Sequence, residues 1–412
     1  MNKYYYSCIN CGKEFDSSAI RYLCDECSKN TEPGNAPKGV LKVNYRYDTL
    51  VSQKESIKEN IGNHNFLQLL PIKSQDSLPP LRVGYTPVYN FNFRDKNLSL
   101  MVKDDSGNPT YSFKDRASQI VSAFAKENNI NTIIAASTGN AGSSIAGICA
   151  SQNQKAIVFV PAAAPKAKLS QIIMYGAKII PVDGTYDDAF DLSLASTQKF
   201  GFYNRNTAFN PLTIEGKKTV AFEIYSQLQF SIPERIFVPV GDGVIISGVF
   251  KGFEDLLKLK LISKMPEIIA VQAKGSSNLI NNLNTDQQIF NCSNTIADSI
   301  SVDIPRNFYM ARNFINHYKC RTVMVDDGEI LEASAILSKN TGLFAEPAAT
   351  AAFAGAFNFL DKYPECKNES NMVISTGSGL KDLNSVQKII QIPKPIGTDI
   401  NNLEKYFDEK GI

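Results

Sequence analysis

The chain is poor in the residues on which many enzyme classes depend. Its 412 residues include two histidines and no tryptophan. His64 lies in the polar stretch IGNHNF and His317 lies in NFINHYKC. Neither setting is typical of a metal ligand or of a Ser-His-Asp triad, and both histidines are expected to be structural or solvated. The sequence therefore argues against a histidine-based metal centre and against triad hydrolysis.

Strong charge and long apolar runs are also missing. The formal net charge of +2 gives no electrostatic basis for binding nucleic acid or an anionic membrane. No apolar run approaches the length that spans a membrane, and the start MNKYYYSC lacks the apolar core of a signal peptide. Hydrophobic content of 43% and charged content of 20% are ordinary for a globular protein. We expect a cytoplasmic enzyme or binding protein.

Four of the eight cysteines stand in two C-x-x-C pairs. Cys8 and Cys11 form the first pair, and Cys24 and Cys27 form the second, with twelve residues between the pairs. Two such pairs can place four thiolates tetrahedrally around zinc. Two disulfides or four free thiols are the alternatives, and the lack of a secretion signal favours zinc. Because the protein would supply all four ligands, such a site is structural and not catalytic.

From about residue 80 the chain alternates between short apolar strands and helices. Helical crossovers between such strands predict parallel sheets and an α/β fold. The predicted strands are NTIIAAS (131–137), KAIVFVP (155–161), KIIPVDG (178–184), RIFVPVG (235–241), EIIAVQA (267–273) and NMVISTG (371–377). The predicted helices between the first three of them are SSIAGICASQNQ (143–154) and KAKLSQIIMYGA (166–177).

Glycine-rich loops follow several of these strands, namely STGNAG, VGDGVIISG and STGSG. In open α/β sheets ligands bind outside the carboxyl ends of the strands, and backbone N–H groups at a helix N-terminus suit an anion. The loop with Gly241 and Gly243 is no dinucleotide fingerprint, because Ile246 stands where the third glycine is required. Ordinary turns also need glycine, so the loops alone are weak evidence for an anion site.

A lysine lies at the start of a predicted helix in NPTYSFKDRASQI (108–120). Ser112 and Asp115 match the capping pattern, which predicts that Ser112 caps a helix through RASQIVSAFAKE and that Lys114 lies in its first turn. The helix dipole there disfavours an ammonium group and so favours the neutral, nucleophilic amine. The alternative is a surface lysine neutralised by Asp115. A reactive lysine beside phosphate-binding loops is what pyridoxal phosphate (PLP) chemistry requires.

An ordered series of motifs resembles the threonine synthase family. The series spans roughly residues 81–385 and comprises NPTYSFKDR, ASTGNAG, IEGKKTVAFEI, PVGDGVIISGVFKGF, FAEPAATAAFAGA and STGSGLKD. VGYTPV is similar to the family's Gly-x-x-Thr-Pro-Leu strand, and the cysteine-rich start is similar to the zinc ribbon of many members. The resemblance implies a two-domain PLP-dependent fold of the tryptophan synthase β type, with parallel sheets and helices on both faces. It implies a zinc ribbon-like module (1–35), an arm (36–80), a large PLP-binding domain (81–108 and 200–392), a small domain (109–199) and a C-terminal tail (393–412).

The resemblance also implies roles for individual residues. Lys114 would form the internal aldimine with PLP and then carry protons to and from substrate carbons. Asn140 would bond the 3′ oxygen of the cofactor, and the hydroxyl of Thr376, or alternatively of Ser375, would meet the ring nitrogen. The cofactor phosphate would lie in the loop of Gly241, Asp242, Gly243, Val244 and Ile245. The substrate carboxylate would be held near Ser137 and Thr138.

The implied reaction converts O-phosphohomoserine and water to threonine and phosphate, in an enzyme that is by default a homodimer. One departure bears on the substrate: NPLTIEGKK has Thr213 where the family has an arginine that binds the substrate's phosphate. A threonine cannot make the bidentate charged contact of an arginine. The lysines that could supply the charge are Lys166, Lys168, Lys217 and Lys218.

Asp242 is a second departure, because Asn or Gly is common in this loop; its carboxylate must turn away from a phosphate to avoid repulsion. The departure at Thr213 supports an alternative, a related PLP lyase that eliminates or replaces another leaving group on a different activated amino acid. A non-catalytic relative that only binds a partner is a further alternative, and such a protein would not need Lys114.

Overall fold

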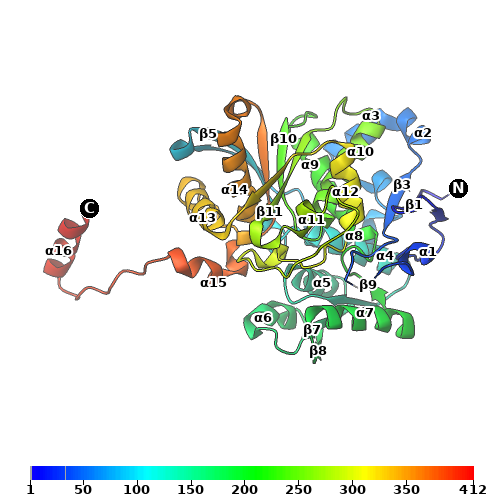
Figure 1. Ribbon diagram of the computed structural model, residues 1–412, viewed down its shortest axis with the longest axis horizontal. Helices are drawn as coiled ribbons and strands as arrows, with labels where there is room; N and C mark the ends of the chain where they lie inside the picture. Colours follow the sequence, from blue (N-terminus) through cyan, green and yellow to red (C-terminus); the bar gives the residue numbers. More distant parts are fainter. Residues whose placement is uncertain (1, 33) are drawn as a thin grey trace.

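The computed structural model of the chain describes residues 2–32 and 34–412, and two sheets, one parallel and one parallel except at one edge, form its framework (Figure 1). The strands are β1 (Tyr4–Cys8), β2 (Glu14–Asp16), β3 (Leu41–Tyr45), β4 (Val88–Phe93), β5 (Leu98–Asp104), β6 (Thr132–Ala136), β7 (Lys155–Pro161), β8 (Lys178–Val182), β9 (Tyr203–Asn204), β10 (Arg235–Pro239), β11 (Glu267–Ala273), β12 (Thr322–Val325) and β13 (Asn371–Ser375). The α-helices are α1 (Asp25–Ser28), α2 (Tyr47–Leu50), α3 (Lys54–Gly62), α4 (Asp115–Glu127), α5 (Asn140–Ser151), α6 (Lys166–Met174), α7 (Tyr186–Phe200), α8 (Leu212–Lys217), α9 (Thr219–Gln227), α10 (Val244–Lys258), α11 (Asn278–Asn281), α12 (Phe308–His317), α13 (Asp327–Thr341), α14 (Pro347–Lys362), α15 (Leu383–Val386) and α16 (Ile400–Lys410).

The larger sheet has the strand order β12-β11-β10-β13-β5-β4. Its neighbours are parallel except for β4 and β5, which pair antiparallel at one edge. Along β10, Ile236 and Val238 belong to one core and Phe237 to another, because alternate side chains point to opposite faces. Helices α8, α9 and α10 supply residues to the first core and α14 to the second, so both faces are covered by helices. The predicted α/β fold with parallel sheets is confirmed.

The smaller sheet has the order β8-β7-β6-β9 and is parallel throughout. Together with α5, α6 and α7 it forms the lower part of the molecule in Figure 1. The strands predicted at 131–137, 155–161 and 178–184 appear here as β6, β7 and β8. The chain returns to this sheet through β9, beyond the end at residue 199 that the sequence suggests for the small domain.

The N-terminal segment forms a three-stranded antiparallel sheet with the order β2-β1-β3. Its third strand, β3, lies beyond the module expected at 1–35, and the arm expected at 36–80 also contains α2 and α3. The sheet is attached to the body of the protein, because the buried hydroxyl of Tyr45 donates to Glu215 Oε2 at 2.6 Å. The arm is therefore an ordered connection rather than a plain linker.

The expectation that VGYTPV is a strand is wrong for most of its length. Gly84 and Tyr85 have φ values of 79° and 48°, which are left-handed and incompatible with a strand. Strand β4 begins only at Val88, the last residue of the motif.

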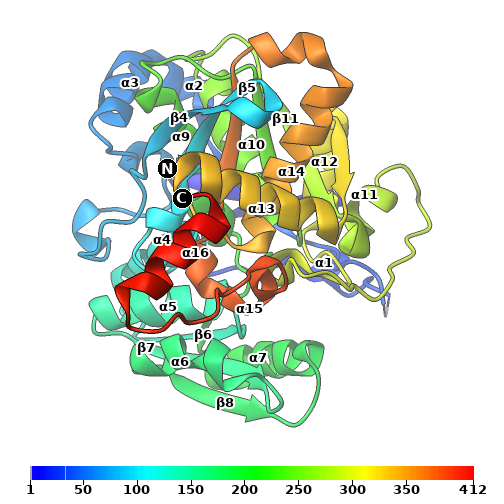
Figure 2. The ribbon, with the colours of Figure 1, turned by 90° about the vertical axis from the view of Figure 1, so that its left-hand side faces the viewer.

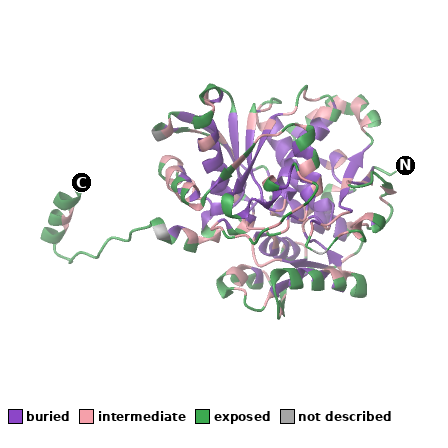
Figure 3. Ribbon diagram, viewed as in Figure 1, coloured by how far each residue is buried: buried purple, intermediate pink, exposed green. Residues whose placement is uncertain are grey.

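The C-terminal tail ends in helix α16, which has no buried residue and lies away from the body of the protein (Figures 1 and 3). In Figure 2, where the left-hand side of Figure 1 faces the viewer, the same helix lies in front of the body of the protein. Among the described residues, none of the helices combines the length and the apolar character needed to cross a membrane.

A buried ion cluster holds the start of α4 against the large sheet. Arg116 has no exposed surface, and its guanidinium contacts Asp105 and Glu223 at 2.6 to 2.8 Å. Burial alone would raise the pKa of Glu223, but the guanidinium and Lys103 together hold it well below its usual value. Removing the arginine would leave two buried carboxylates without this counter-ion and would lower the free energy of unfolding by about 3–5 kcal/mol. The cluster therefore sets the position of Lys114, two residues before Arg116.

Candidate active site

A cavity of about 520 Å³ lies between the two sheets, at the carboxyl ends of β6 and β10. Side chains and loops of both domains line it, including both glycine loops that follow these strands. The lining residues used below are Lys114, Ser137, Thr138, Asn140, Tyr186, Arg205, Lys217, the loop 241–245, Ser299 and Arg306. The cavity therefore brings together most of the residues that the sequence indicates.

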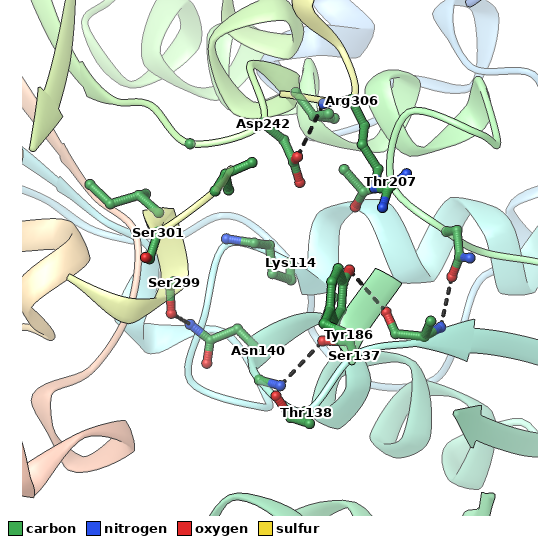
Figure 4. Close-up of a pocket in the computed structure, with 18 of the residues that line it drawn as sticks. Lys114, Ser137, Thr138, Asn140, Tyr186, Thr207, Asp242, Ser299, Ser301 and Arg306 are labelled. Atoms are coloured by element: carbon green, nitrogen blue, oxygen red, sulfur yellow. Dashed lines mark hydrogen bonds between the residues drawn. The ribbon is translucent and has the colours of Figure 1, made fainter. Parts of the chain in front are cut away.

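Lys114 reaches into this cavity between Asp242 and Asn140 (Figure 4). The predicted cap is wrong in detail: helix α4 begins at Asp115 with Lys114 in the N-cap position, and no side chain caps it. The carboxylate of Asp115 instead accepts hydrogen bonds from the backbone and hydroxyl of Thr110, at 2.7 and 2.5 Å. Because Asp115 is buried and its carboxylate is hydrogen-bonded to Thr110, the alternative of a surface lysine neutralised by Asp115 does not apply.

Burial is the main influence on the Lys114 amine. It lowers the pKa of Lys114, as does the positive charge of Arg205, while the carboxylates of Glu346 and Asp242 act in the opposite direction. The direction agrees with the neutral amine expected from the sequence, and its largest cause is desolvation by burial. A lysine with a lowered pKa has a larger neutral fraction and is a better nucleophile near neutral pH.

The loop from Gly241 to Ile245 joins β10 to the start of α10 and faces the cavity. Gly243 is the N-cap residue, with φ of 82°, and a Cβ there would lie 2.8 Å from the Cβ of Ala311. The first N–H groups of α10 have no partner within the helix and can bind an anion. The side chain of Asp242 accepts the backbone N–H of Arg306 at 3.3 Å, as an aspartate that avoids a phosphate should.

Asn140 begins helix α5 on the opposite side of the cavity, next to Ser137 and Thr138 (Figure 4). Its amide donates to both oxygens of Glu346, at 3.0 and 2.8 Å, and to Ser299 Oγ at 3.2 Å. Burial raises the pKa of Glu346, and the nearby charge of Lys114 opposes this rise. The loop 137–140 thus combines hydroxyls and a helix N-terminus, which together suit a carboxylate.

Six residues that the sequence suggests as cofactor or substrate ligands are not among those that line the cavity: Thr213, Ser375, Thr376, Lys166, Lys168 and Lys218. Thr213 is fully buried, and its hydroxyl donates to the carbonyl of Asn210 at 2.8 Å. Thr376 is buried beside the Lys114 segment, where its carbonyl accepts the N–H of Phe113 at 2.8 Å. Lys168 lies at the rim and is paired with Asp298 at 2.9 Å.

Three lining or neighbouring residues were not assigned a role from the sequence, namely Tyr186, Arg205 and Glu346, whereas Lys217 is one of the four lysines considered for the substrate phosphate. Glu346 lies in the motif FAEPAATAAFAGA and Lys217 lies in IEGKK, so the family motifs already mark both segments in the sequence. Tyr186 and Arg205 lie outside every motif, and only the fold brings them to the cavity. Burial raises the pKa of Tyr186 to about 12, so its hydroxyl is uncharged at neutral pH.

Comparison with known proteins agrees with this geometry. The sequence profile of the family described as "Pyridoxal-phosphate dependent enzyme" matches residues 80–377. Threonine synthase of Methanocaldococcus jannaschii is 34% identical over 98% of this chain and 99% of its own length. Threonine synthase of Methanosarcina acetivorans is 30% identical over 98% of each chain. The chain belongs to the PLP-dependent enzyme family and, within it, to the threonine synthases.

Solved structures show the same fold at lower identity. The processed form of threonine deaminase isoform 2 from Solanum lycopersicum has a TM-score of 0.63 and 19% identity, over 91% of this chain and 99% of its own. A PLP-dependent aspartate racemase has a TM-score of 0.62 and 20% identity, over 81% and 97%.

The cavity fits the cofactor of this family. PLP has an aldehyde, which a lysine with a lowered pKa can attack, and a phosphate, which a helix N-terminus can bind. Lys114 and the loop 241–245 provide these two features in one cavity. A Cβ at Gly243 would lie within 3 Å of Ala311 and Leu279, so at this position the loop can present only its backbone to a ligand.

The cysteine pairs form a separate cluster at the N-terminus. The Sγ atoms of Cys8, Cys11, Cys24 and Cys27 all lie within 4.8 Å of one another. Cys11 Sγ and Cys24 Sγ are 3.9 Å apart, far more than the roughly 2.05 Å of a disulfide. None of the four cysteines forms a disulfide in the structure, so the disulfide alternative is not supported.

We expect Gly243→Ala to weaken PLP binding at least about tenfold, whereas Gly176→Ala should leave it unchanged. Both glycines have positive φ, 82° and 78°, so each alanine should cost about 1–2 kcal/mol of stability through backbone strain. Only the Cβ at 243 meets a neighbour, while nothing lies within 4 Å of one at 176. Titration of the apoprotein with PLP by visible absorbance measures the difference; equal affinities in the two variants would contradict the role of the loop.

Proposed function

We propose that the protein is a PLP-dependent threonine synthase, which converts O-phosphohomoserine and water to threonine and inorganic phosphate. The observation that carries the proposal is Lys114, a lysine with a lowered pKa that faces an anion-binding loop across one cavity. The 34% identity to a threonine synthase over nearly the whole chain supports this substrate. A homodimer in the cytoplasm is the expected form.

When bound, PLP supplies an electron sink that stabilises negative charge on substrate carbons. The loop 241–245 would hold its phosphate, Asn140 its 3′ oxygen, and the hydroxyl of Thr376 or Ser375 its ring nitrogen. A neutral hydroxyl does not stabilise a protonated ring nitrogen as strongly as a carboxylate would, so the cofactor would withdraw electrons only moderately.

Lys114 is the group that moves protons. Its Nζ lies in the cavity with a lowered pKa, so it can accept a proton from substrate Cα and then from Cβ, and return protons later. Ser137 and Thr138, beside the N-terminus of α5, would orient the substrate carboxylate. One lysine thus performs the acid–base work for which many enzymes use a histidine.

The second candidate is a related lyase that acts on a differently activated amino acid. The observation that favours it is Thr213, whose hydroxyl bonds Asn210 and whose side chain is not among the cavity residues. In that case the protein would release acetate or another group in preference to phosphate.

The assay that separates the two candidates supplies O-phosphohomoserine or O-acetylhomoserine to the holoenzyme. We expect threonine and phosphate in equal amounts from the first substrate, and a loss of at least about 10³-fold in rate for Lys114→Ala, because the acid–base group is removed. Lys126→Ala, an exposed lysine of the same helix, should keep the wild-type rate. Turnover of the acetyl substrate alone would reject the first candidate in favour of the second.

We also propose that the four-cysteine cluster binds one structural zinc ion. Four thiolates within 4.8 Å of one another match the Cys₄ ligand set that zinc prefers. The cluster has no open position for a substrate, so the metal would stabilise the N-terminal module and take no part in turnover.

We expect one zinc per chain in the purified protein and a loss of most of it in Cys24→Ser, measured by elemental mass spectrometry. Cys292→Ser is the matched control, because Cys292 is exposed and lies outside the cluster. A metal-free wild-type protein that is as stable as the zinc-loaded form would reject the zinc site.

A further inference from the structure

Two buried cations in the cavity have no counter-ion among the described residues. Arg205 follows β9 and Lys217 ends α8, and each is 1% exposed. Lys217 Nζ and Arg205 Nη2 have no hydrogen-bond partner, and neither side chain contacts a carboxylate of the described chain. The other guanidinium nitrogens of Arg205 donate only to hydroxyls, Ser118 Oγ at 3.3 Å and Thr207 Oγ1 at 3.1 Å.

Outside the cavity, the fully buried lysines and arginines of the described chain are paired with carboxylates. Lys218, the residue after Lys217, contacts Glu215 at 2.5 Å and Asp255 at 2.7 Å. Arg116 is paired with two carboxylates in the same way. An unpaired buried charge destabilises the folded protein, and this cost is offset when a ligand supplies the opposite charge. The exception at Arg205 and Lys217 therefore points to an anion that binds between them.

Both cations share the cavity with Lys114. Burial lowers the pKa of Lys217 well below its usual value, and the positive charges of Arg205 and Lys114 lower it further. The three basic groups therefore repel one another electrostatically. Asp242 is the one carboxylate that acts against this lowering, and it already accepts a backbone N–H of Arg306. Three further carboxylates line the cavity, but Asp187 contacts Arg306, Asp298 contacts Lys168 and Asp303 accepts the backbone N–H of Ser293, so none of them contacts Arg205 or Lys217.

We propose that Arg205 and Lys217 bind the phosphate group of the substrate, in place of the arginine that Thr213 replaces. The proposal rests on the proposed function and names the residues that recognise its leaving group. It also decides among the four lysines that the sequence leaves open, because Lys166 is exposed, Lys168 is paired with Asp298, and Lys218 is paired with Glu215 and Asp255. Lys217 is the one of the four that lines the cavity.

The two side chains differ in what they offer a phosphate. The guanidinium of Arg205 is planar and has an unused nitrogen, while Lys217 adds a compact charge. When the bond between substrate Cγ and the phosphate oxygen breaks, its electron pair leaves with the phosphate, and the two cations stabilise the charge that grows there. The cofactor phosphate has its own site at the N-terminus of α10, so the cavity provides for two phosphates.

The test compares Arg205→Gln and Lys217→Gln with Lys264→Gln, an exposed surface lysine paired with Glu234 outside the cavity. Calorimetric titration of each holoenzyme with inorganic phosphate should give at least about tenfold weaker binding for the first two variants, and an unchanged value for the third. The KM for O-phosphohomoserine should rise in parallel. PLP content and the absorbance change on adding homoserine, which lacks the phosphate, should stay at wild-type values, and Arg205→Lys should recover part of the phosphate affinity.

Thermal unfolding gives a readout that a structural role would not produce. Because each substitution removes a buried basic group that has no carboxylate partner, both glutamine variants should unfold at or above the wild-type temperature without phosphate, and phosphate should stabilise them less than wild type. Wild-type phosphate affinity in both variants, or their failure to fold, would overturn the proposal. Loss of PLP from Lys217→Gln with unchanged phosphate binding would instead assign Lys217 to the cofactor and overturn its proposed role.

These outcomes are separate from a failure of the proposed function, because calorimetry needs no turnover. A wild-type holoenzyme that binds phosphate through both residues, yet releases none from O-phosphohomoserine, would reject threonine synthesis alone.

Discussion

The buried ion pairs of Arg116 are the interaction on which the geometry of the site depends. They hold the first turn of α4 against Asp105 and Glu223, and so place Lys114 at the edge of the cavity. They also place Lys217, because α8 packs directly on this turn: a Cβ on Gly216 would overlap the carbonyl of Arg116. One cluster thus sets the positions of the two lysines that share the cavity.

Electrostatic balance distinguishes this cavity from the rest of the interior. The body of the protein neutralises its buried cations with carboxylates, as at Lys103 and Lys218. In the cavity, Glu346 is tied to Asn140 and Asp242 to a backbone N–H, which leaves Lys114, Arg205 and Lys217 without a direct carboxylate contact. Such a cavity is costly when empty and favourable when phosphate groups enter, which suits a reaction with a phosphorylated cofactor and a phosphorylated substrate.

Much of the fold could be predicted from the sequence, because parallel strands buried on both faces appear as short apolar runs. The strands β7 (Lys155–Pro161) and β11 (Glu267–Ala273) have the predicted limits. The cap of α4 could not be predicted, since two residues compete for the same donors and acceptors: Asp115 bonds Thr110 in place of completing a cap with Ser112. Positive φ at Tyr85 likewise has no sequence signal.

The site was predictable where one segment carries both the residue and its context, as at Lys114 and the loop 241–245. The role of Arg205 could not be predicted from the sequence. The argument for it depends on the lack of a counter-ion among the described residues, which is a property of the packed structure. The same holds for Glu346, which reaches Asn140 from a segment 206 residues away.

Two buried lysines with lowered pKa in one cavity make the identity of the nucleophile the central question. Reduction of the PLP-loaded protein with borohydride, followed by peptide mass spectrometry, traps the cofactor on the lysine that holds it. We expect the pyridoxyl group on Lys114 and on no other residue. A pyridoxyl group on Lys217 would contradict the account, because it would exchange the roles of nucleophile and phosphate ligand.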